Sequence, residues 1–154
     1  MKNTFNRISV FITVVFYATL ALLFSIFLIS HFNPGSPAKA NLKITWISNN
    51  PSYKSLFFEP NIDLTPQFTF NTKQIILYLN LKSTMEDGTV KEELVWFKAV
   101  QNGTEYKMFS SEKSQYTFSG NAKNMYEVEL RGNIFPYVGH MMDVSYGTLD
   151  YKIN

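Results

Sequence analysis

The chain of 154 residues is long enough for one domain of ordinary size, and its lack of cysteine excludes a disulfide framework and a thiolate metal site. The net charge of +2 comes from Lys2 and Arg7, because the part from Lys39 onward holds 12 basic residues (14 minus these two) and all 12 acidic ones. This neutral part lacks the basic face that nucleic-acid binding requires, and the 16% of aromatic residues favours β structure.

Residues 8–32 form an apolar run that contains no Asp, Glu, Lys or Arg. At 1.5 Å per residue, such a helix is roughly 36 Å long, which is enough to cross a hydrocarbon core of about 30 Å with some tilt. We therefore expect a cytosolic tail over 1–7, a transmembrane signal anchor over 8–32 that binds the lipid bilayer, and a linker over 33–41.

Two other interpretations of the apolar run are open. A cleaved signal peptide would use the small residues Ala38 and Ala40, but the apolar region of a signal peptide is typically about 7–15 residues. A buried core helix is the other interpretation, but this run is apolar on all sides, which favours a membrane span in a chain of this size. The charges on either side of the run nearly balance, so the short tail and the neutral remainder decide the orientation. They favour a single-pass type II protein with its C-terminal domain across the membrane.

Residues 42–154 have the pattern of an all-β domain. Ile75, Leu77 and Leu79 share one face of the strongest strand and Ile76 and Tyr78 share the other, which predicts a strand covered on both sides. Turn signals recur roughly every ten residues, which is typical of an antiparallel β-sandwich. The predicted strands, in chain order, cover residues 42–47, 68–83, 90–100, 104–110, 114–120, 124–132 and 140–153.

Two short stretches allow more than one interpretation. Asn102-Gly103 predicts a two-residue hairpin turn that pairs the strands on either side of it. The sequence Asn102-Gly103-Thr104 is also an N-x-T glycan acceptor if this part of the chain enters the secretory lumen. Phe57-Phe58 fits either a small helix or an apolar anchor under a loop.

The sequence shows no pattern typical of an active site. His140 and Asp143 are three residues apart, so in a strand they point to opposite faces. The acidic stretch 86–93 lacks the alternating order of a calcium loop, and G-x-S-x-G does not occur. We therefore expect no catalytic residue, no metal and no cofactor, although a dispersed Ser–Lys pair stays open.

Residues 70–79, "FNTKQIILYL", resemble the most recognisable strand of the signal peptidase complex subunit 3 family, the 22/23 kDa subunit. That strand has the pattern Trp/Phe-Asn-x-Lys-Gln followed by apolar residues and Tyr. The resemblance continues in order through 94–100, 116–118, 120–121 and 126–136. The chain departs from the family by being shorter, by Phe-Asn-Thr in place of Trp-Asn-Val, and by lacking a sequon at Asn124.

The resemblance implies a non-catalytic accessory subunit of the endoplasmic-reticulum signal peptidase. Its luminal sandwich would support the catalytic subunit, in complex with other subunits, during cleavage of signal peptides from secretory precursors. Glycosylation cannot be carried over from the family and depends on Asn102 alone. Two alternatives are an unrelated membrane-anchored binding module and an anchored hydrolase with a Ser–Lys site.

Overall fold

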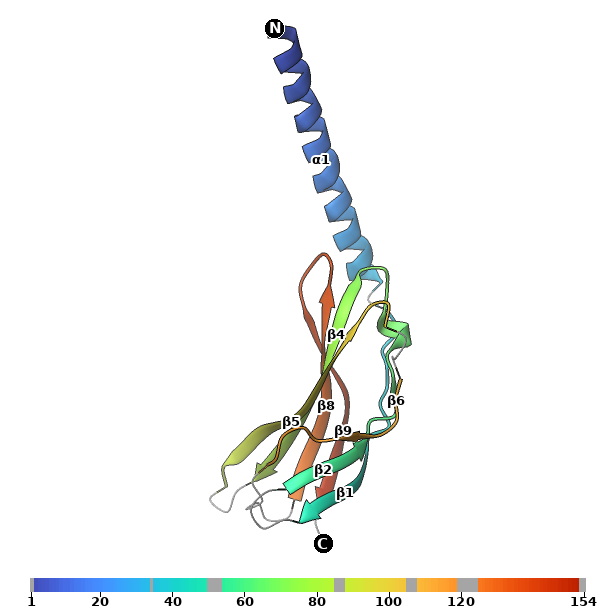
Figure 1. Cartoon of the computed structure of the whole chain (residues 1–154), viewed down its shortest axis with the longest axis vertical. Helices are drawn as coiled ribbons and strands as arrows, with labels where there is room; N and C mark the ends of the chain where they lie inside the picture. The colour runs from blue at the N-terminus through green and yellow to red at the C-terminus, as the bar shows by residue number, and fades with distance from the viewer. Residues whose placement is uncertain are drawn as a thin grey trace. The chain divides into compact units, whose positions relative to one another are not determined.

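Figure 1 shows the computed structural model of the chain, which describes residues 2–33, 35–49, 54–84, 88–104, 108–118 and 125–152. The chain divides into two compact units, Met1–Pro34 and Gly35–Asn154. The first unit holds an apolar helix and the second holds antiparallel β-sheets, which confirms the predicted fold class.

The helix of the first unit, α1, spans Lys2–Phe32 and so begins before the predicted membrane span. Its segment Asn3–Phe32 has a mean hydropathy of 2.5 and is long and apolar enough to cross a membrane. Hydroxyl groups in the apolar run donate to carbonyls one turn earlier, which satisfies them without water. These bonds measure 2.8–2.9 Å and come from Thr13, Thr19 and Ser25. The bounds of tail, span and linker stay predictions.

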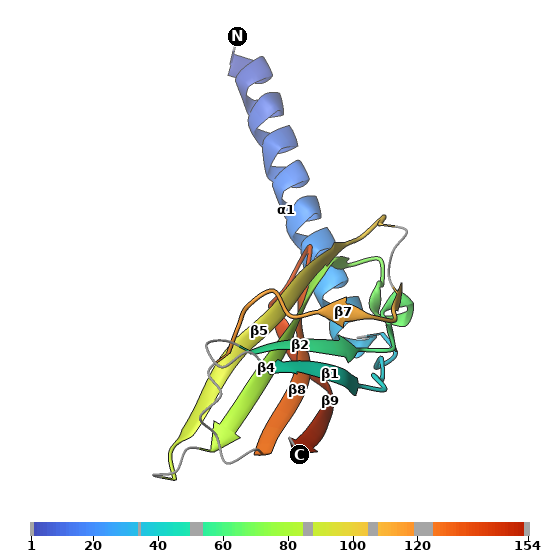
Figure 2. The ribbon, with the colours of Figure 1, turned by 60° about the horizontal axis from the view of Figure 1, so that its bottom comes forward.

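Nine strands and one 3₁₀ turn lie in the described part of the second unit. They are β1 (Lys43–Asn49), β2 (Lys54–Glu59), β3 (Ile62–Asp63), η1 (Thr65–Gln67), β4 (Thr72–Thr84), β5 (Val90–Gln101), β6 (Met108–Phe109), β7 (Glu112–Lys113), β8 (Met125–Pro136) and β9 (Met142–Lys152). The four long strands form one antiparallel sheet in the order β5-β4-β8-β9, and β1-β2-β7 form a second. In Figure 2 the second sheet lies across the long strands, and β3 and β6 pair separately.

The core fills the space between the two sheets. Phe58 of β2 meets Trp96 of β5 edge to face, with ring centroids 5.4 Å apart, and both side chains are buried. β4 contributes its alternate residues Ile75, Leu77 and Leu79, each fully buried. The sandwich is therefore held by large apolar side chains from the inner faces of two sheets.

The outer face of β4 corrects one expectation. Ile76, Tyr78 and Asn80 are only half-buried, and no other strand of the described domain lies over them. The apolar residues on this face suggested a covering layer, but they alternate with polar side chains that reach solvent. The long sheet is thus covered on one side, in the manner of many antiparallel sheets.

The turn at Asn102-Gly103 is present, but the predicted hairpin is wrong. The Thr104 amide donates to the Gln101 carbonyl at 3.2 Å, and Gly103 has φ +89° while Asn102 keeps a negative φ. This combination is typical of a type II turn, whose twist does not match that of a hairpin, for which type I′ needs both residues positive. Residues 105–107 of the predicted strand 104–110 lie outside the described part, and β6, which belongs to the same predicted strand, pairs with β3 rather than with β5.

Two further local predictions also need correction. Phe57-Phe58 belong to strand β2, where Phe58 points into the core, so they form neither a helix nor a loop anchor. In the predicted strand 114–120, the described residues pair only through an isolated bridge of Phe118 to Lys54, and residues 119 and 120 lie outside the described part. The strand that extends the small sheet is β7, just before it.

A glycine in β8 makes room for a buried tyrosine of β9. The Tyr146 hydroxyl donates to Oε1 of buried Gln67 at 2.6 Å, which fixes the ring. A Cβ on Gly132 would lie 2.6 Å from Cε2 of Tyr146, closer than carbon atoms approach. The ring cannot give way without breaking this hydrogen bond, so position 132 needs glycine.

We expect Gly132→Ala to lower the free energy of unfolding by about 1–3 kcal/mol, because the added methyl group overpacks the site. Urea unfolding of the full chain in detergent micelles, followed by near-ultraviolet circular dichroism, measures the change. Gly147→Ala is the matched control, because a Cβ there would lie 3.6 Å from the Ala40 carbonyl oxygen, an ordinary contact. Equal stabilities of the two variants would contradict this account of Tyr146.

Candidate interaction surface

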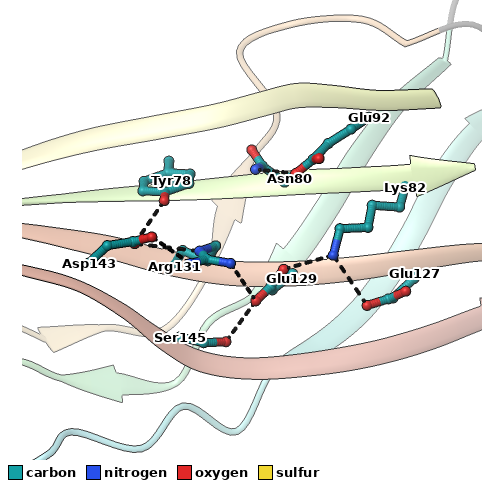
Figure 3. A network of polar contacts seen from close by, with 9 residues as sticks. All are labelled: Tyr78, Asn80, Lys82, Glu92, Glu127, Glu129, Arg131, Asp143 and Ser145. Atoms are coloured by element: carbon teal, nitrogen blue, oxygen red, sulfur yellow. Dashed lines mark hydrogen bonds and ion pairs between the residues drawn. The ribbon is translucent and has the colours of Figure 1, made fainter. Parts of the chain in front are cut away.

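The uncovered side of the four-stranded sheet, here called the open face, combines an apolar half and a charged half. The antiparallel register places Tyr78 of β4 opposite Phe97 of β5 and opposite Arg131 of β8. Residues facing solvent therefore line up across the strands, apolar toward β5 and charged toward β8 and β9. Figure 3 shows the charged half.

The apolar half contains a shallow groove of about 510 Å³. Leu94 and Phe97 of β5 form one side and are 46% and 40% exposed, which is high for large apolar side chains. Phe97 stacks on Tyr116, with ring centroids 6.3 Å apart. The lining residues are Ile76, Tyr78, Asn80, Leu94, Phe97 and Asn133.

A β-bulge in β5 produces this groove. The register shifts between Leu79, which faces Trp96, and Asn80, which faces Leu94, so Val95 is an extra residue. Val95 and Trp96 are both buried as a result, whereas their neighbours on either side turn to the open face. The Val95 carbonyl accepts two amides, those of residues 115 and 116, at 3.0 Å each, which holds the bulge in place.

Glu129 is the centre of the charged half. Its side chain is only 9% exposed, yet it is fully paired. Lys82 binds it at 3.0 Å, Arg131 at 3.3 Å, and the Ser145 hydroxyl donates to it at 2.9 Å. A buried carboxylate needs such partners, because losing its water shell costs several kcal/mol.

The network continues from Arg131 to the neighbouring strand. Arg131 also pairs with Asp143 of β9, and the Tyr78 hydroxyl donates to the same carboxylate at 2.9 Å. Asp143 is therefore the ion-pair partner of Arg131. From the sequence, it had been considered only as a possible partner of His140. Of the acidic stretch 86–93, residues 86 and 87 lie outside the described residues, and Glu92 accepts a bond from Asn80 at 2.8 Å.

These contacts lower the pKa of both central carboxyls. Burial raises the pKa of Glu129, but the hydrogen bonds from Lys82 and Ser145 outweigh it, so the pKa lies below its ordinary value. The Arg131 guanidinium holds the pKa of Asp143 below its usual range. A carboxylate held ionised in this way is a weak base, so Ser145 is not activated as a nucleophile. The open face is suited to binding.

Asn102 lies at the end of β5, beyond the groove. Its side chain is exposed, and its backbone amide donates to the Lys73 carbonyl at 2.9 Å.

The network around Glu129 was not predicted from the sequence. The available signal was the order Glu127, Glu129, Arg131 along one face of a strand, where opposite charges two residues apart are neighbours.

The lowered pKa values predict how stability depends on pH. Folded Glu129 and Asp143 release protons at lower pH than they do in the unfolded chain, so the unfolded chain binds more protons in this range. Their contribution is complete above the unfolded pKa values, near about 4. It is lost as the pH falls through the folded values.

Glu129→Gln should lower the free energy of unfolding at neutral pH by about 1–3 kcal/mol, because Lys82 loses a buried anionic partner. The variant should also lose less stability than the wild type on acidification. Urea unfolding of the full chain in micelles across a pH series measures both effects. The control is Glu127→Gln. The Glu127 side chain is 44% exposed and lies 3.6 Å from the same lysine, so this substitution should lower the free energy of unfolding by less than about 1 kcal/mol. A variant at 129 with the pH profile of the wild type would be inconsistent with this assignment.

Comparison with known proteins identifies the family. No curated protein matches the chain. A crystal structure described as the ApaA protein of Bordetella pertussis is 10% identical over 78% of this chain and 98% of that one, but its TM-score of 0.37 is too low to support an argument. The model of the signal peptidase subunit family matches residues 1–154. This match over the whole length shows that the chain belongs to the signal peptidase subunit family.

Proposed function

We propose that the chain is a non-catalytic accessory subunit of the endoplasmic-reticulum signal peptidase complex, corresponding to subunit 3. The observation that carries the proposal is the family match across residues 1–154, which includes both the apolar helix and the β domain. Membership of a subunit family implies association with other subunits of a signal peptidase complex. It also removes the basis for an unrelated anchored binding module.

The proposed orientation is type II. Lys2 and Arg7 precede the apolar run, and the bulk of the chain is neutral. The β domain would then be luminal, and α1 would be its single membrane anchor. The lumen is the side of the membrane on which signal peptides would be removed from secretory precursors.

A supporting rather than catalytic role agrees with the chemistry of the open face. Lys82, Glu129, Arg131 and Asp143 are paired with one another, and Ser145 is bonded to a carboxylate of lowered pKa. We propose that the signal peptidase catalytic subunit covers the groove formed by Leu94 and Phe97. Exposed large apolar side chains beside a groove are typical of a surface that a partner desolvates.

The docking proposal is tested by affinity purification of the tagged full chain from gently solubilised membranes. The catalytic subunit should co-purify with the wild type. Leu94→Glu should reduce its recovery roughly tenfold or more, because an unpaired carboxylate would be buried at the interface. Met108→Glu is the matched control, since Met108 is 66% exposed but lies on β6, away from the open face.

The two outcomes of this purification separate two claims. A wild-type eluate without the catalytic subunit would contradict the accessory function itself. Equal recovery with Leu94→Glu and with Met108→Glu would contradict only the choice of the open face.

We further propose that Asn102 carries an N-linked glycan, as its exposure on a turn and the luminal orientation would allow. Asn102→Gln should abolish an endoglycosidase-sensitive mobility shift. Thr104→Ala should abolish it as well, whereas Thr104→Ser should retain it, because only the hydroxyl residue is part of the acceptor. A wild-type chain without any shift would refute the glycan and remove one support for the orientation.

A further inference from the structure

The point at which the chain enters the β domain is fixed by Gly35. A Cβ there would lie 3.1 Å from both the Pro66 carbonyl oxygen and Cγ2 of Thr69, and φ is +84°. The entry point is thus packed against the segment that precedes β4. Gly35 is three residues after Phe32, the last residue of α1, and three extended residues reach at most about 11 Å.

This short tether limits the distance between the entry point and the membrane. Whatever the angle between helix and domain, Gly35 is held within about 11 Å of the end of the apolar run, and the adjoining Thr69 side chain within roughly 16 Å. Headgroup layers are themselves about 5–8 Å thick on each side of the hydrocarbon core. The loops beside Thr69 are therefore held near a bilayer surface by the tether itself.

Three large apolar side chains are exposed on these loops. Phe70 is 61% exposed, Tyr137 is 62% exposed and Met141 is 50% exposed. Phe70 occupies the turn that the Thr72 amide closes on the Thr69 carbonyl at 3.1 Å. Exposure of these apolar side chains to water contributes no favourable free energy of burial to the fold.

Asn71 ties the two loops together. Its side-chain amide donates to the Val138 carbonyl at 2.8 Å, and the Val138 amide donates back to its Oδ1 at 3.0 Å. The Tyr137 amide donates to the Asn71 carbonyl at 2.8 Å. Because Asn71 is buried and makes all three bonds, Phe70 and Tyr137 are presented from one rigid base.

We propose that Phe70, Tyr137 and Met141 form a lipid-binding tip that inserts into the headgroup layer of the leaflet where the span ends. Tyr137, with an apolar ring and a polar hydroxyl, is a residue type favoured at this depth, Phe70 adds apolar area, and the flexible thioether of Met141 adapts to mobile lipid chains. Lys73, exposed three residues after Phe70, can face anionic headgroups.

The lipid-binding tip is separate from the open-face groove, because none of its three residues lines that groove. It requires only that α1 spans a bilayer, and it does not depend on the proposed accessory function. The two proposals can therefore fail independently.

Site-directed spin labelling tests the tip, because the chain has no cysteine and a single introduced one gives a unique label. Tyr137→Cys and Met141→Cys report on the tip. Thr84→Cys is the matched control, since it is exposed at the far end of β4, about 40 Å along the strand from Thr72. The full-length variants are placed in vesicles of phosphatidylcholine with a minority of phosphatidylinositol.

Labels at 137 and 141 should collide with lipid-soluble oxygen more than with a water-soluble nickel chelate, with a collision ratio several-fold above that at 84. In the Phe70→Ser background, the ratio at 141 should fall toward that of the control. Unchanged melting temperatures show that the labelled variants are folded. Ratios at 137 and 141 equal to that at 84 in folded protein would overturn the proposal.

Discussion

The bulge in β5 is the feature on which both faces of the four-stranded sheet depend. Because Val95 is an extra residue, Trp96 turns inward and meets Phe58 of the small sheet, which joins the two layers of the sandwich. The same irregularity turns Leu94 and Phe97 outward together, although strict alternation would have separated them. One local departure from regular pairing thus stabilises the core and creates the apolar groove.

The charged half of the open face complements this groove. Glu129 is nearly buried before any partner arrives, and Lys82, Arg131 and Ser145 already satisfy it. Covering these four groups would therefore leave none of them unpaired, whereas the groove offers apolar area that gains from being covered. A partner that covers both halves would gain affinity from the groove, and the fixed charges would determine its orientation on the sheet.

The sequence was sufficient for the elements whose pattern is local. The apolar run predicted α1, and the patterns in 68–83 and 90–100 predicted the strands β4 and β5, which the structure confirms. Prediction from the sequence failed where the structure depends on contacts between residues far apart in the chain. The turn at Gly103 has the wrong twist to return the chain beside β5, and the contacts of Glu129 come from β4 and β9, far along the chain. Apolar residues on both faces of β4 also suggested a covering layer, since composition alone does not distinguish a covered face from a binding face.

The lipid-binding tip and the open face are linked by the direction of β4. Thr72 begins this strand at the tip, and the groove starts at Ile76, four residues or about 13 Å further along. If the tip rests in the headgroup layer, the groove lies just above the membrane surface, within reach of a partner that is itself anchored there. Asn102 directly follows β5 at the same end of the sheet, and its backbone amide donates to the Lys73 carbonyl. It lies on the side of β4 away from Tyr137, because β5 and β8 flank β4. A glycan at Asn102 and lipid contact at Tyr137 would therefore occupy different sides of one end of the domain, and neither would cover the groove.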